Sequence, residues 1–212
     1  MKTAQVILSI IRRITMLIIA THNAHKLQEI SEILAPMTCM GASSFHAPVP
    51  EETGLTFFEN ALIKARAISL YTQKPVIADD SGLVVPVLKD APGIYSSRYA
   101  GEHATDEQNR LLLLQNMKGM QHREAYFYCA MVFLRHAKDP CPLIGLGQWD
   151  GKILHEERGE NGFGYDALFL VESKNCSAAE LESSEKNRIS HRGLALLQLK
   201  QQMIHHGILP HT

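Results

Sequence analysis

Short apolar segments alternate with helical patterns along this chain, and that alternation restricts its fold more than any other feature. Residues 16–20 form an isoleucine-rich run that is typical of a buried strand. In the next segment, apolar side chains recur at helical spacing until Pro36, at Leu27, Ile30, Ile33 and Leu34. A strand, a short turn and a helix in this order indicate the α/β class.

The later segments continue this alternation. Capping residues and apolar stripes predict helices over residues 56–71, 106–117, 178–187 and 190–205. Apolar or aromatic runs predict extended segments at residues 76–78, 83–88, 125–134, 143–149, 152–157 and 168–171. Residues 37–55 and 91–98 are expected to be loops. The sequence shows no repeat and no low-complexity linker, and we expect an α/β fold with a mixed sheet.

The composition argues against several classes of function. The 212 residues carry a formal net charge of -1 and a sequence pI of about 6.8, so a nucleic acid is not the expected partner. The cysteines have no Cys-x-x-Cys spacing, which argues against a zinc site and a disulfide framework. Free thiols fit a reducing cytoplasm, and we expect a cytoplasmic protein.

Residues 1–15 differ from the rest of the chain. Their apolar run, residues 6–11, is too short to span a bilayer, and Arg12 and Arg13 follow it, whereas a signal peptide places its charges first. Because Met16 stands just before the first strand, we expect residues 1–15 to be a dispensable extension. A short amphipathic surface anchor is the competing interpretation. We expect one domain over residues 16–206, a tail at 207–212 and no membrane partner.

The turn from Thr21 to Lys26 joins the first strand to the first helix. A helix N-terminus offers free backbone N–H groups and the positive end of its dipole, and Lys26 adds a charge, so this turn suits a phosphate. A lysine about 4 Å from a phosphate oxygen gains roughly 4 kcal/mol at an effective dielectric of about 20. The alternative is a capped helix with a solvated lysine, because the glycine-rich P-loop pattern is absent.

Two acidic pairs are candidates for a metal site. Glu51 and Glu52 precede a predicted helix, and Asp79 and Asp80 are predicted to end a strand, where ligands collect in open α/β sheets. Carboxylates from two elements beside a phosphate suit Mg²⁺, and a remaining carboxylate can orient or deprotonate water. Alternatively, the glutamates lie in a solvated loop and the aspartates open a turn.

The loop from Gly159 to Asp166 contains three glycines and two aromatic residues. The glycines permit a backbone path that other residues would strain, and the rings of Phe163 and Tyr165 provide flat faces for a base. Stacking of this kind is worth about 1–3 kcal/mol per base. The alternative is a hairpin whose aromatic rings belong to the core.

Lys186 and the segment from Ser190 to Arg192 are the last candidates. Ser190 is a good N-cap, and His191 and Arg192 at the start of the last helix can donate hydrogen bonds to a ring acceptor. Positive charge is mildly unfavourable at this end of the helix dipole, so the basic pair indicates an acceptor-rich partner. The alternative is a basic first turn exposed to water.

Six stretches of the chain together resemble the inosine triphosphate pyrophosphatase family. They follow the family order from Met16 to about Lys200: THNAHK, EETGLTFFENALIKA, IADDSGL, APGIYSSRYAG, GFGYDALF and EKNRISHRGLAL. The resemblance implies an α/β fold with an elongated mixed β-sheet and flanking helices, in two lobes around a central nucleotide-binding cleft. It also implies a homodimer.

The resemblance further implies hydrolysis of non-standard purine nucleoside triphosphates (ITP, dITP, XTP) to the monophosphate and pyrophosphate, with Mg²⁺ as cofactor. The implied catalytic residues are Asp80, as proton acceptor, Lys26 and Glu52, and the implied metal ligands are Glu52 and Asp80. The implied substrate-binding residues are Thr21, His22, Asn23, Ala24, His25, Lys26, Ser81, Phe163, Gly164, Tyr165, Asp166, Lys186, His191 and Arg192.

We expect a water activated by Asp80 to attack the α-phosphorus, while Mg²⁺ and Lys26 offset charge as pyrophosphate leaves. Inosine and xanthine carry an acceptor at O6 where adenine carries an amine, so donors on His191 and Arg192 favour them. A mismatched adenine leaves buried donors unpaired, at about 1–3 kcal/mol each. Rejection of guanine, which also has O6, requires a further feature near its N2.

Two positions depart from the family pattern. His22 stands where the family usually has glycine, so the phosphate turn must accept a side chain there. Ala167 stands where proline commonly follows the Gly-Tyr-Asp run, which loosens that turn. Neither change removes a catalytic group, and residues 1–15 match nothing in the pattern.

Two other functions compete with this one. A related Maf-like pyrophosphatase for modified nucleotides keeps the fold, but its phosphate turn usually lacks the Asn-x-x-Lys arrangement. A nucleotide-binding module without turnover belongs to another class, and the intact Glu52, Asp80 and Lys26 argue against it. The substitution Asp80→Asn separates them, because only an enzyme has turnover to lose.

Overall fold

The computed structural model describes residues 16–210, so the predicted extension 1–15 lies outside the described residues. The strands are β1 (Met16–Ile19), β2 (Thr38–Gly41), β3 (Val76–Val84), β4 (Glu124–Leu134), β5 (Leu143–Ile153), β6 (Phe169–Val171) and β7 (Cys176–Ser177). The α-helices are α2 (Ala24–Leu34), α3 (Phe57–Thr72), α4 (Asp106–Asn116), α5 (Ser183–Ile189) and α6 (His191–His205). Short 3₁₀ turns include η1 (Ala42–Phe45), η3 (Gly93–Arg98) and η5 (Ala178–Glu180).

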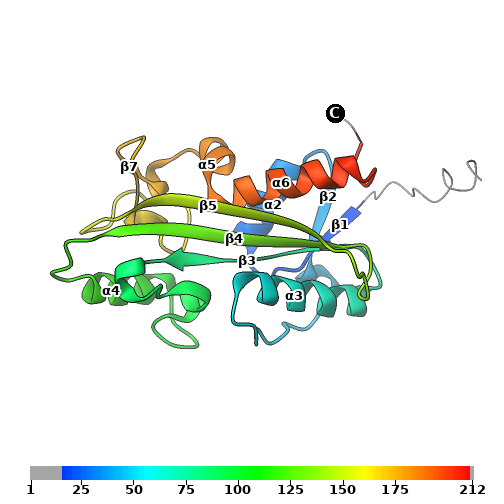
Figure 1. Cartoon of the computed structure of the whole chain (residues 1–212), viewed down its shortest axis with the longest axis horizontal. Helices are drawn as coiled ribbons and strands as arrows, with labels where there is room; N and C mark the ends of the chain where they lie inside the picture. Colours follow the sequence, from blue (N-terminus) through cyan, green and yellow to red (C-terminus); the bar gives the residue numbers. More distant parts are fainter. Residues whose placement is uncertain (1–15, 211–212) are drawn as a thin grey trace, which may run out of the picture.

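All seven strands form one mixed sheet in the order β2-β1-β3-β4-β5-β6-β7. β1 pairs in parallel with β2 and β3, and the remaining neighbours are antiparallel. The long strands β4 and β5 run along the length of the molecule (Figure 1). The predicted α/β fold with an elongated mixed sheet and flanking helices is therefore confirmed.

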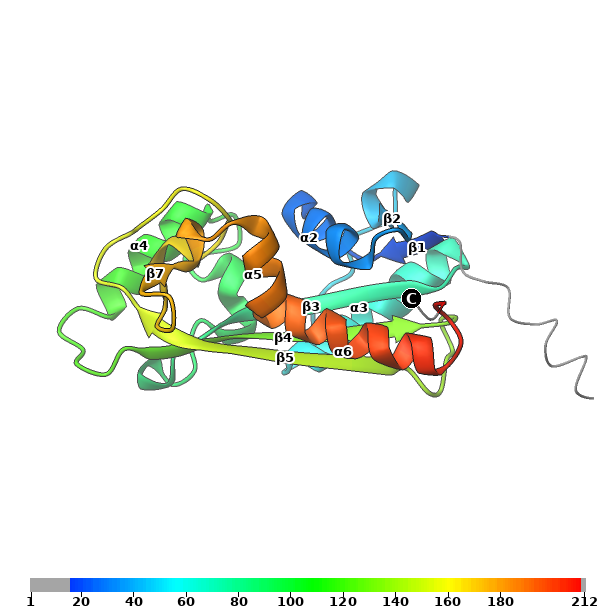
Figure 2. The ribbon, with the colours of Figure 1, turned by 90° about the horizontal axis from the view of Figure 1, so that it is seen from above.

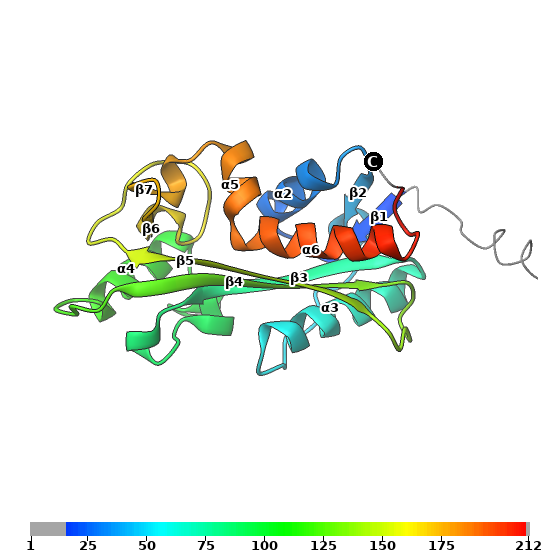
Figure 3. The same cartoon turned by 45° about the horizontal axis from the view of Figure 1, so that its top comes forward.

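Helices cover both faces of the sheet, and the sequence of β1 shows why. Ile18 packs with the α3 side chains Ala61 and Ala65, whereas Leu17 and Ile19 pack on the opposite face with α2 and α6. Successive side chains of a strand point to opposite faces, so an unbroken apolar run is buried on both sides. Figure 3 shows α3 on one face and α2 and α6 on the other.

A separate core lies at the far end of the long strands. There α4, β6 and β7 gather away from β1 and β2 (Figure 2). Its buried side chains come from β3, β4 and β5 as well as from these elements, and include Leu83, Leu113, Phe127, Trp149 and Phe169. The cores at the two ends are compatible with two lobes, which remain a prediction.

Glycines in β5 let α6 approach the sheet very closely. A Cβ atom on Gly147 would lie 2.0 Å from the His191 carbonyl oxygen, and one on Gly145 would lie 2.1 Å from that of Ala195. Side chains at these positions would force the helix away. This close packing brings the first turn of α6, with His191 and Arg192, onto the sheet.

The prediction that Asp79 and Asp80 end a strand is wrong. β3 is continuous from Val76 to Val84 and pairs with β4 over its whole length, so both aspartates lie in its middle. The predicted extended segment 83–88 leaves the sheet after Val84. Hydrogen bonds to β4 hold the polar stretch in strand conformation although its sequence resembles a turn.

Three other boundaries differ from the predictions. The predicted loop 37–55 contains the edge strand β2, whose partner β1 supplies the ladder, and the turn η1. The predicted segments 143–149 and 152–157 are one strand that ends at Ile153. The predicted helix 178–187 begins only at Ser183, because residues 178–180 form a 3₁₀ turn that Ser177 and Glu180 cap.

The C-terminal end of the described chain packs against the rest of the molecule. Leu209, within the predicted tail 207–212, packs into the core between α2 and α6. Within residues 16–210, no helix is both long and apolar enough to cross a bilayer. The domain boundaries remain predictions.

Candidate functional site

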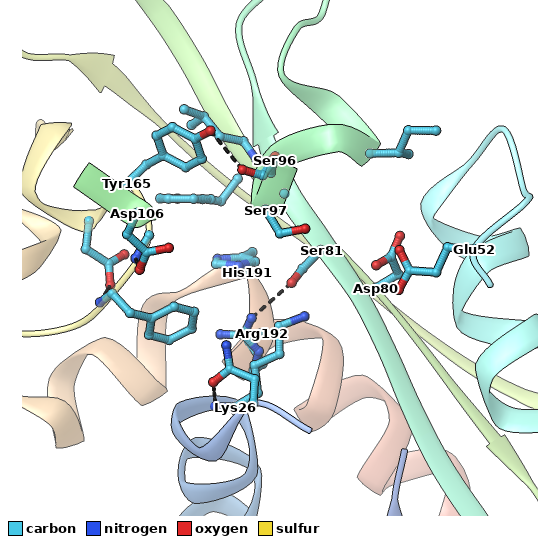
Figure 4. Close-up of a pocket in the computed structure, with 18 of the residues that line it drawn as sticks. Lys26, Glu52, Asp80, Ser81, Ser96, Ser97, Asp106, Tyr165, His191 and Arg192 are labelled. Carbon is cyan, nitrogen blue, oxygen red and sulfur yellow. Dashed lines mark hydrogen bonds between the residues drawn. The ribbon is translucent and has the colours of Figure 1, made fainter. Parts of the chain in front are cut away.

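One cavity collects most of the predicted site residues, which we call the central cavity (Figure 4). The predicted residues that line it are Asn23, Lys26, Glu52, Asp80, Ser81, Phe163, Gly164, Tyr165, Asp166, Lys186, His191 and Arg192. They come from α2 and its N-cap, β3, α5, α6, the loop before α3 and the loop after β5. Segments that are far apart in the sequence therefore meet around one space, as the predicted nucleotide site requires.

Asp79 anchors the lysine of the phosphate turn. Its Oδ2 lies 2.9 Å from Lys26 Nζ and 3.6 Å from Arg192 Nε. Burial alone raises the pKa of the Asp79 carboxyl, but the charges of Lys26, Arg192 and Lys64 outweigh burial and hold the pKa well below its ordinary value. The predicted alternative of a solvated lysine at position 26 is wrong, because this side chain is largely buried beside Asp79.

Asp80 belongs to a second ionic group. Lys64 Nζ donates to Glu52 Oε1 at 2.8 Å and to Asp80 Oδ1 at 2.9 Å, and Asn60 donates to the other Asp80 oxygen at 3.3 Å. Burial raises the pKa of Asp80, and the nearby Glu52 raises it further, although Lys64 and Lys26 act in the opposite direction. A carboxylate with a raised pKa is a stronger base, which suits a proton acceptor.

At the other end of the cavity, Glu29 pairs with the basic residues Lys186 and Arg192. Its carboxylate accepts from Lys186 Nζ at 2.9 Å and from Arg192. Lys186 also donates to Asp166 at 2.7 Å. Arg192 donates to Ser81 Oγ at 3.0 Å, as Figure 4 shows. These contacts fix the direction of both cations, and the predicted alternative of an exposed basic turn is wrong because Arg192 is 3% exposed.

His191 is buried and uncharged. Its ring stacks on Phe127, with centroids 4.7 Å apart and planes 12° apart. Burial lowers the pKa of His191 well below its ordinary value, and the charges of Arg192, Lys186 and Lys26 lower it further. Within residues 16–210, its Nδ1 has no hydrogen-bond partner. A buried polar atom of this kind calls for a partner, which a bound ligand can supply.

The two aromatic residues of the glycine loop both line the central cavity but differ in their burial. Phe163 is half-buried, and Lys186 Nζ and Arg192 Cζ lie 5.0 Å and 5.5 Å from its ring centroid. Tyr165 is 4% exposed and donates from its hydroxyl to the Ser96 carbonyl at 2.9 Å. Tyr165 therefore satisfies both interpretations, because it lines the cavity and packs in the core.

Four predicted residues of the phosphate turn are not among those that line the central cavity: Thr21, His22, Ala24 and His25. Asn23 caps α2, because its side chain accepts from the backbone N–H groups of His25 and Lys26. His22 Nε2 lies 3.0 Å from the Ala47 carbonyl oxygen, so the side chain at this unusual position ties the turn to the loop that leads to Glu52.

Comparison with known proteins agrees with this geometry. Residues 17–202 match the model of the Ham1 family. The chain belongs to the Ham1 family. A dITP/XTP pyrophosphatase of Legionella pneumophila (strain Lens) is 50% identical over 186 residues, which are 87% of this chain and 96% of that protein. The dITP/XTP pyrophosphatase of Vibrio parahaemolyticus is 48% identical over 88% of this chain and 96% of its own.

A solved Ham1 structure supports the same assignment. The HAM1 protein from Coxiella burnetii superposes with a TM-score of 0.83 at 44% sequence identity, covering 90% of this chain and 98% of that one. The shared fold therefore extends over most of the chain.

The sequence-based prediction missed several charged residues of this site, among them Lys64 and Asp106, which line the cavity, and Glu29, which pairs with Lys186. Lys64 lies on the buried stripe of α3, beside Asn60 and Ala61. A lysine and an asparagine on an otherwise apolar helix face are a readable signal, since such groups are rarely buried without a partner. Glu29 gave no such signal, because a glutamate in a first helix is ordinary until its partners, Lys186 and Arg192, are known.

The carboxylates of Glu52 and Asp80 form a small donor set that fits Mg²⁺. Among the described residues, no group of three His, Cys, Asp or Glu side chains could hold a metal. Mg²⁺ requires fewer protein ligands, since one or two carboxylates, waters and phosphate oxygens suffice. The carboxylates of Glu52 and Asp80 already converge on one cation, Lys64 Nζ, so their placement fits a second cation brought by a phosphate chain.

Proposed function

We propose that this chain hydrolyses non-standard purine nucleoside triphosphates, such as ITP, dITP and XTP, to the monophosphate and pyrophosphate. The activity would keep these nucleotides out of DNA and RNA. The observation that carries the proposal is the convergence of Lys26, Asp80 and Arg192 on one cavity. Relatives with the name dITP/XTP pyrophosphatase, 50% and 48% identical, support it.

The metal would be Mg²⁺, held by Glu52 and Asp80. When bound, it supplies positive charge to the phosphate oxygens and polarises them. Lys64 keeps the two carboxylates together, with Nζ 2.8 Å and 2.9 Å from their oxygens. The chain thus holds its metal ligands in position before substrate arrives, which lowers the cost of ordering them on binding.

The phosphate end of the cavity provides charge and a base. Lys26 and the N-terminus of α2 bind the triphosphate, and Asp80 accepts a proton from the attacking water. The new bond forms between the water oxygen and the α-phosphorus, and the bond between the α-phosphorus and the bridging oxygen breaks. Pyrophosphate then leaves as the second product. Thr21, His22, Ala24 and His25 belong to the same turn in this proposal.

The base end of the cavity selects the purine. The ring stacks on Phe163, and Arg192 and the neutral His191 donate to O6. Glu29 and Ser81 hold the guanidinium in place, so the donors are preorganised. Adenine offers an amine to these donors, and each donor left unpaired costs about 1–3 kcal/mol.

A homodimer and a cytoplasmic location complete the proposal. Large apolar side chains are exposed near the loop before α3 and near η3: Leu55 is 84% exposed and Tyr95 is 55% exposed. Together with Phe57, Ile94 and Tyr128, they line a broad apolar groove that a second copy of the chain could cover. Sedimentation equilibrium of the wild type and of Leu55→Asp tests this, and a monomeric wild type would contradict it.

A substrate panel with product analysis tests the reaction. The protein is incubated with Mg²⁺ and ITP, XTP, dITP, GTP or ATP, and pyrophosphate and orthophosphate are measured separately. We expect pyrophosphate from ITP, XTP and dITP, with ATP turned over far more slowly. Release of orthophosphate, or equal turnover of ATP and ITP, would contradict the proposal.

The variant Asp80→Asn separates an enzyme from a nucleotide-binding module. Loss of a general base costs about 10²–10⁴-fold in rate. We expect the variant to lose turnover by at least that factor and to keep ITP binding in isothermal titration. Wild-type protein that binds ITP without producing monophosphate would favour the binding module. A preference for methylated or modified pyrimidine nucleotides would favour the Maf-like alternative.

A further inference from the structure

His25 and Phe163 form a stacked pair between segments that are far apart in the sequence. Their ring centroids lie 5.3 Å apart and their planes differ by 16°. His25 is the second residue of α2, in the phosphate turn, and Phe163 lies in the glycine loop between β5 and β6. The contact therefore joins the segment expected to bind phosphate with the segment expected to bind the base.

Phe163 borders two cavities. Phe163 lines the central cavity, and it also lines a second, smaller cavity between α2 and α5. His25 is among the residues that line the second cavity and is not among those that line the first. The imidazole that stacks on Phe163 therefore belongs to the wall of the second cavity and not to that of the central cavity.

Phe163 lies between two glycines whose backbone angles are unusual. The residue stands between Gly162 and Gly164, whose φ angles are +77° and +61°. Glycine adopts such angles freely and also leaves them freely, so this loop is intrinsically permissive. Hydrogen bonds hold this backbone, because Phe163 N–H donates to Asp166 Oδ2 at 2.9 Å and Gly164 N–H donates to Asp106 Oδ2 at 2.7 Å. The contacts of the ring itself then act on the side-chain torsions, which set the orientation of its plane.

Other contacts hold α2 against the same region. Glu29 pairs with Lys186, and Glu32 accepts from Asn187 at 2.7 Å. These polar contacts lie further along α2 and grip α5, whereas the His25 ring contacts the loop itself. Of these three α2 side chains, His25 contacts the Phe163 ring itself, which is expected to stack with the base.

We propose that His25 is a positioning residue for purine binding, which it supports by stacking on the Phe163 ring rather than by contacting phosphate. The proposal rests on the proposed function, in which a purine stacks on Phe163. A ring held by such a contact is preorganised, so less ordering is required when the base binds. Removal of the imidazole should weaken binding of the base and leave binding of the phosphate chain unchanged.

The first experiment compares steady-state kinetics on ITP for the wild type, His25→Ala and His25→Phe. An aromatic pair of this kind is worth enough to change affinity by about twofold to tenfold. We expect His25→Ala to raise KM by that factor, with kcat changed less than about twofold. His25→Phe should restore KM, because a phenyl ring stacks equally well. An unchanged KM in His25→Ala would overturn the proposal.

The second experiment separates the base from the phosphate chain. Inorganic tripolyphosphate is used as a competitive inhibitor of ITP hydrolysis, and its Ki is measured for the same variants. We expect the Ki to be equal in the wild type and His25→Ala. A Ki that rises as much as KM would show that His25 binds phosphate, and would overturn the proposal. Gln28→Ala is the matched control, because Gln28 is exposed on the same helix and lines the same second cavity.

A double-mutant cycle provides the third test. Because His25 acts through Phe163, adding His25→Ala to Phe163→Ala should raise KM no further. Full additivity of the two effects would contradict the coupling. The dissociation constant for ITP from isothermal titration is measured in parallel for all variants. Wild-type turnover of ITP tests the proposed function, and the difference between variants tests His25, so the two can fail separately. Wild-type protein that neither binds nor hydrolyses ITP overturns both.

Discussion

Asp79 and Asp80 are neighbours in β3, yet their carboxylates contact different lysines. Asp79 Oδ2 lies 2.9 Å from Lys26 Nζ, and Asp80 Oδ1 lies 2.9 Å from Lys64 Nζ. Successive side chains of a strand point to opposite faces, so one short acidic sequence serves two separate groups. The two pKa shifts also differ in direction: that of Asp79 is lowered and that of Asp80 is raised.

Replacing each aspartate by asparagine should have opposite consequences for stability. A lowered folded-state pKa means that folding favours the charged form, so at pH 7.5 Asp79 contributes its full stabilisation. We expect Asp79→Asn to reduce the free energy of unfolding by about 3–5 kcal/mol, because buried Lys26 and Arg192 lose their partner. Asp80→Asn should be within about 1 kcal/mol of the wild type or more stable, because its raised pKa means that folding disfavours the charge.

Urea unfolding at pH 7.5 without added metal measures both values. Equal losses in the two variants would contradict the division of β3 into two ionic groups. As the pH falls below about 4, the unfolded chain protonates Asp79 while the folded protein still keeps it charged, so the difference between the wild type and Asp79→Asn should shrink.

Removal of Lys64 should make the protein depend more on Mg²⁺. In Lys64→Met, the carboxylates of Glu52 and Asp80 lose the ammonium that they share. We expect the variant to have a lower Tm than the wild type without metal. We also expect its Tm to rise more than that of the wild type in about 10 mM Mg²⁺, since the ion replaces the lost charge. Differential scanning fluorimetry measures both, and Lys74→Met, at an exposed lysine, is the control. An equal Mg²⁺ response in the two variants would exclude the carboxylate pair as the metal site.

Glu29→Gln should weaken selectivity for the purine. The carboxylate holds Lys186 and Arg192, and the amide keeps its volume but not its charge. We expect KM for ITP to rise about tenfold and the preference for ITP over ATP to fall by a similar factor, as the donors lose their fixed direction. Glu102→Gln, at an exposed glutamate of another segment, is the control. Unchanged selectivity in Glu29→Gln would show that the guanidinium needs no anchor.

His191 should make stability fall on acidification. Its pKa is lowered in the folded state, so it stays neutral when the pH drops below about 6.5, whereas the unfolded chain takes up a proton. Stability is therefore retained above this pH and lost as the pH falls through it. Between about pH 7.5 and pH 5, we expect the Tm of His191→Asn to decline less steeply than that of the wild type. Parallel curves would mean that the ring is protonated in the fold.

Local patterns in the sequence were enough to predict most of the helices and strands. The isoleucine-rich run at residues 16–20 predicted a strand, and the apolar stripes of α3 and α6 predicted helices. These predictions succeeded because the spacing of apolar residues along the chain follows the spacing of buried side chains in a strand or a helix. Strand boundaries failed where a partner decided them: β2 exists because β1 offers a ladder, and β3 continues through Asp79 and Asp80 because β4 pairs with it.

The sequence by itself determined which residues could serve the site, since motifs in one order named Lys26, Asp80 and Arg192. Only the tertiary structure decided which charged side chains form ion pairs with one another. It placed Lys26 on Asp79, Lys64 between Glu52 and Asp80, and Glu29 on Arg192. The physical reason is that ion pairing and burial depend on the distances between helices and strands. The packing of the helices on the sheet sets these distances, and they produce no periodic pattern in the sequence.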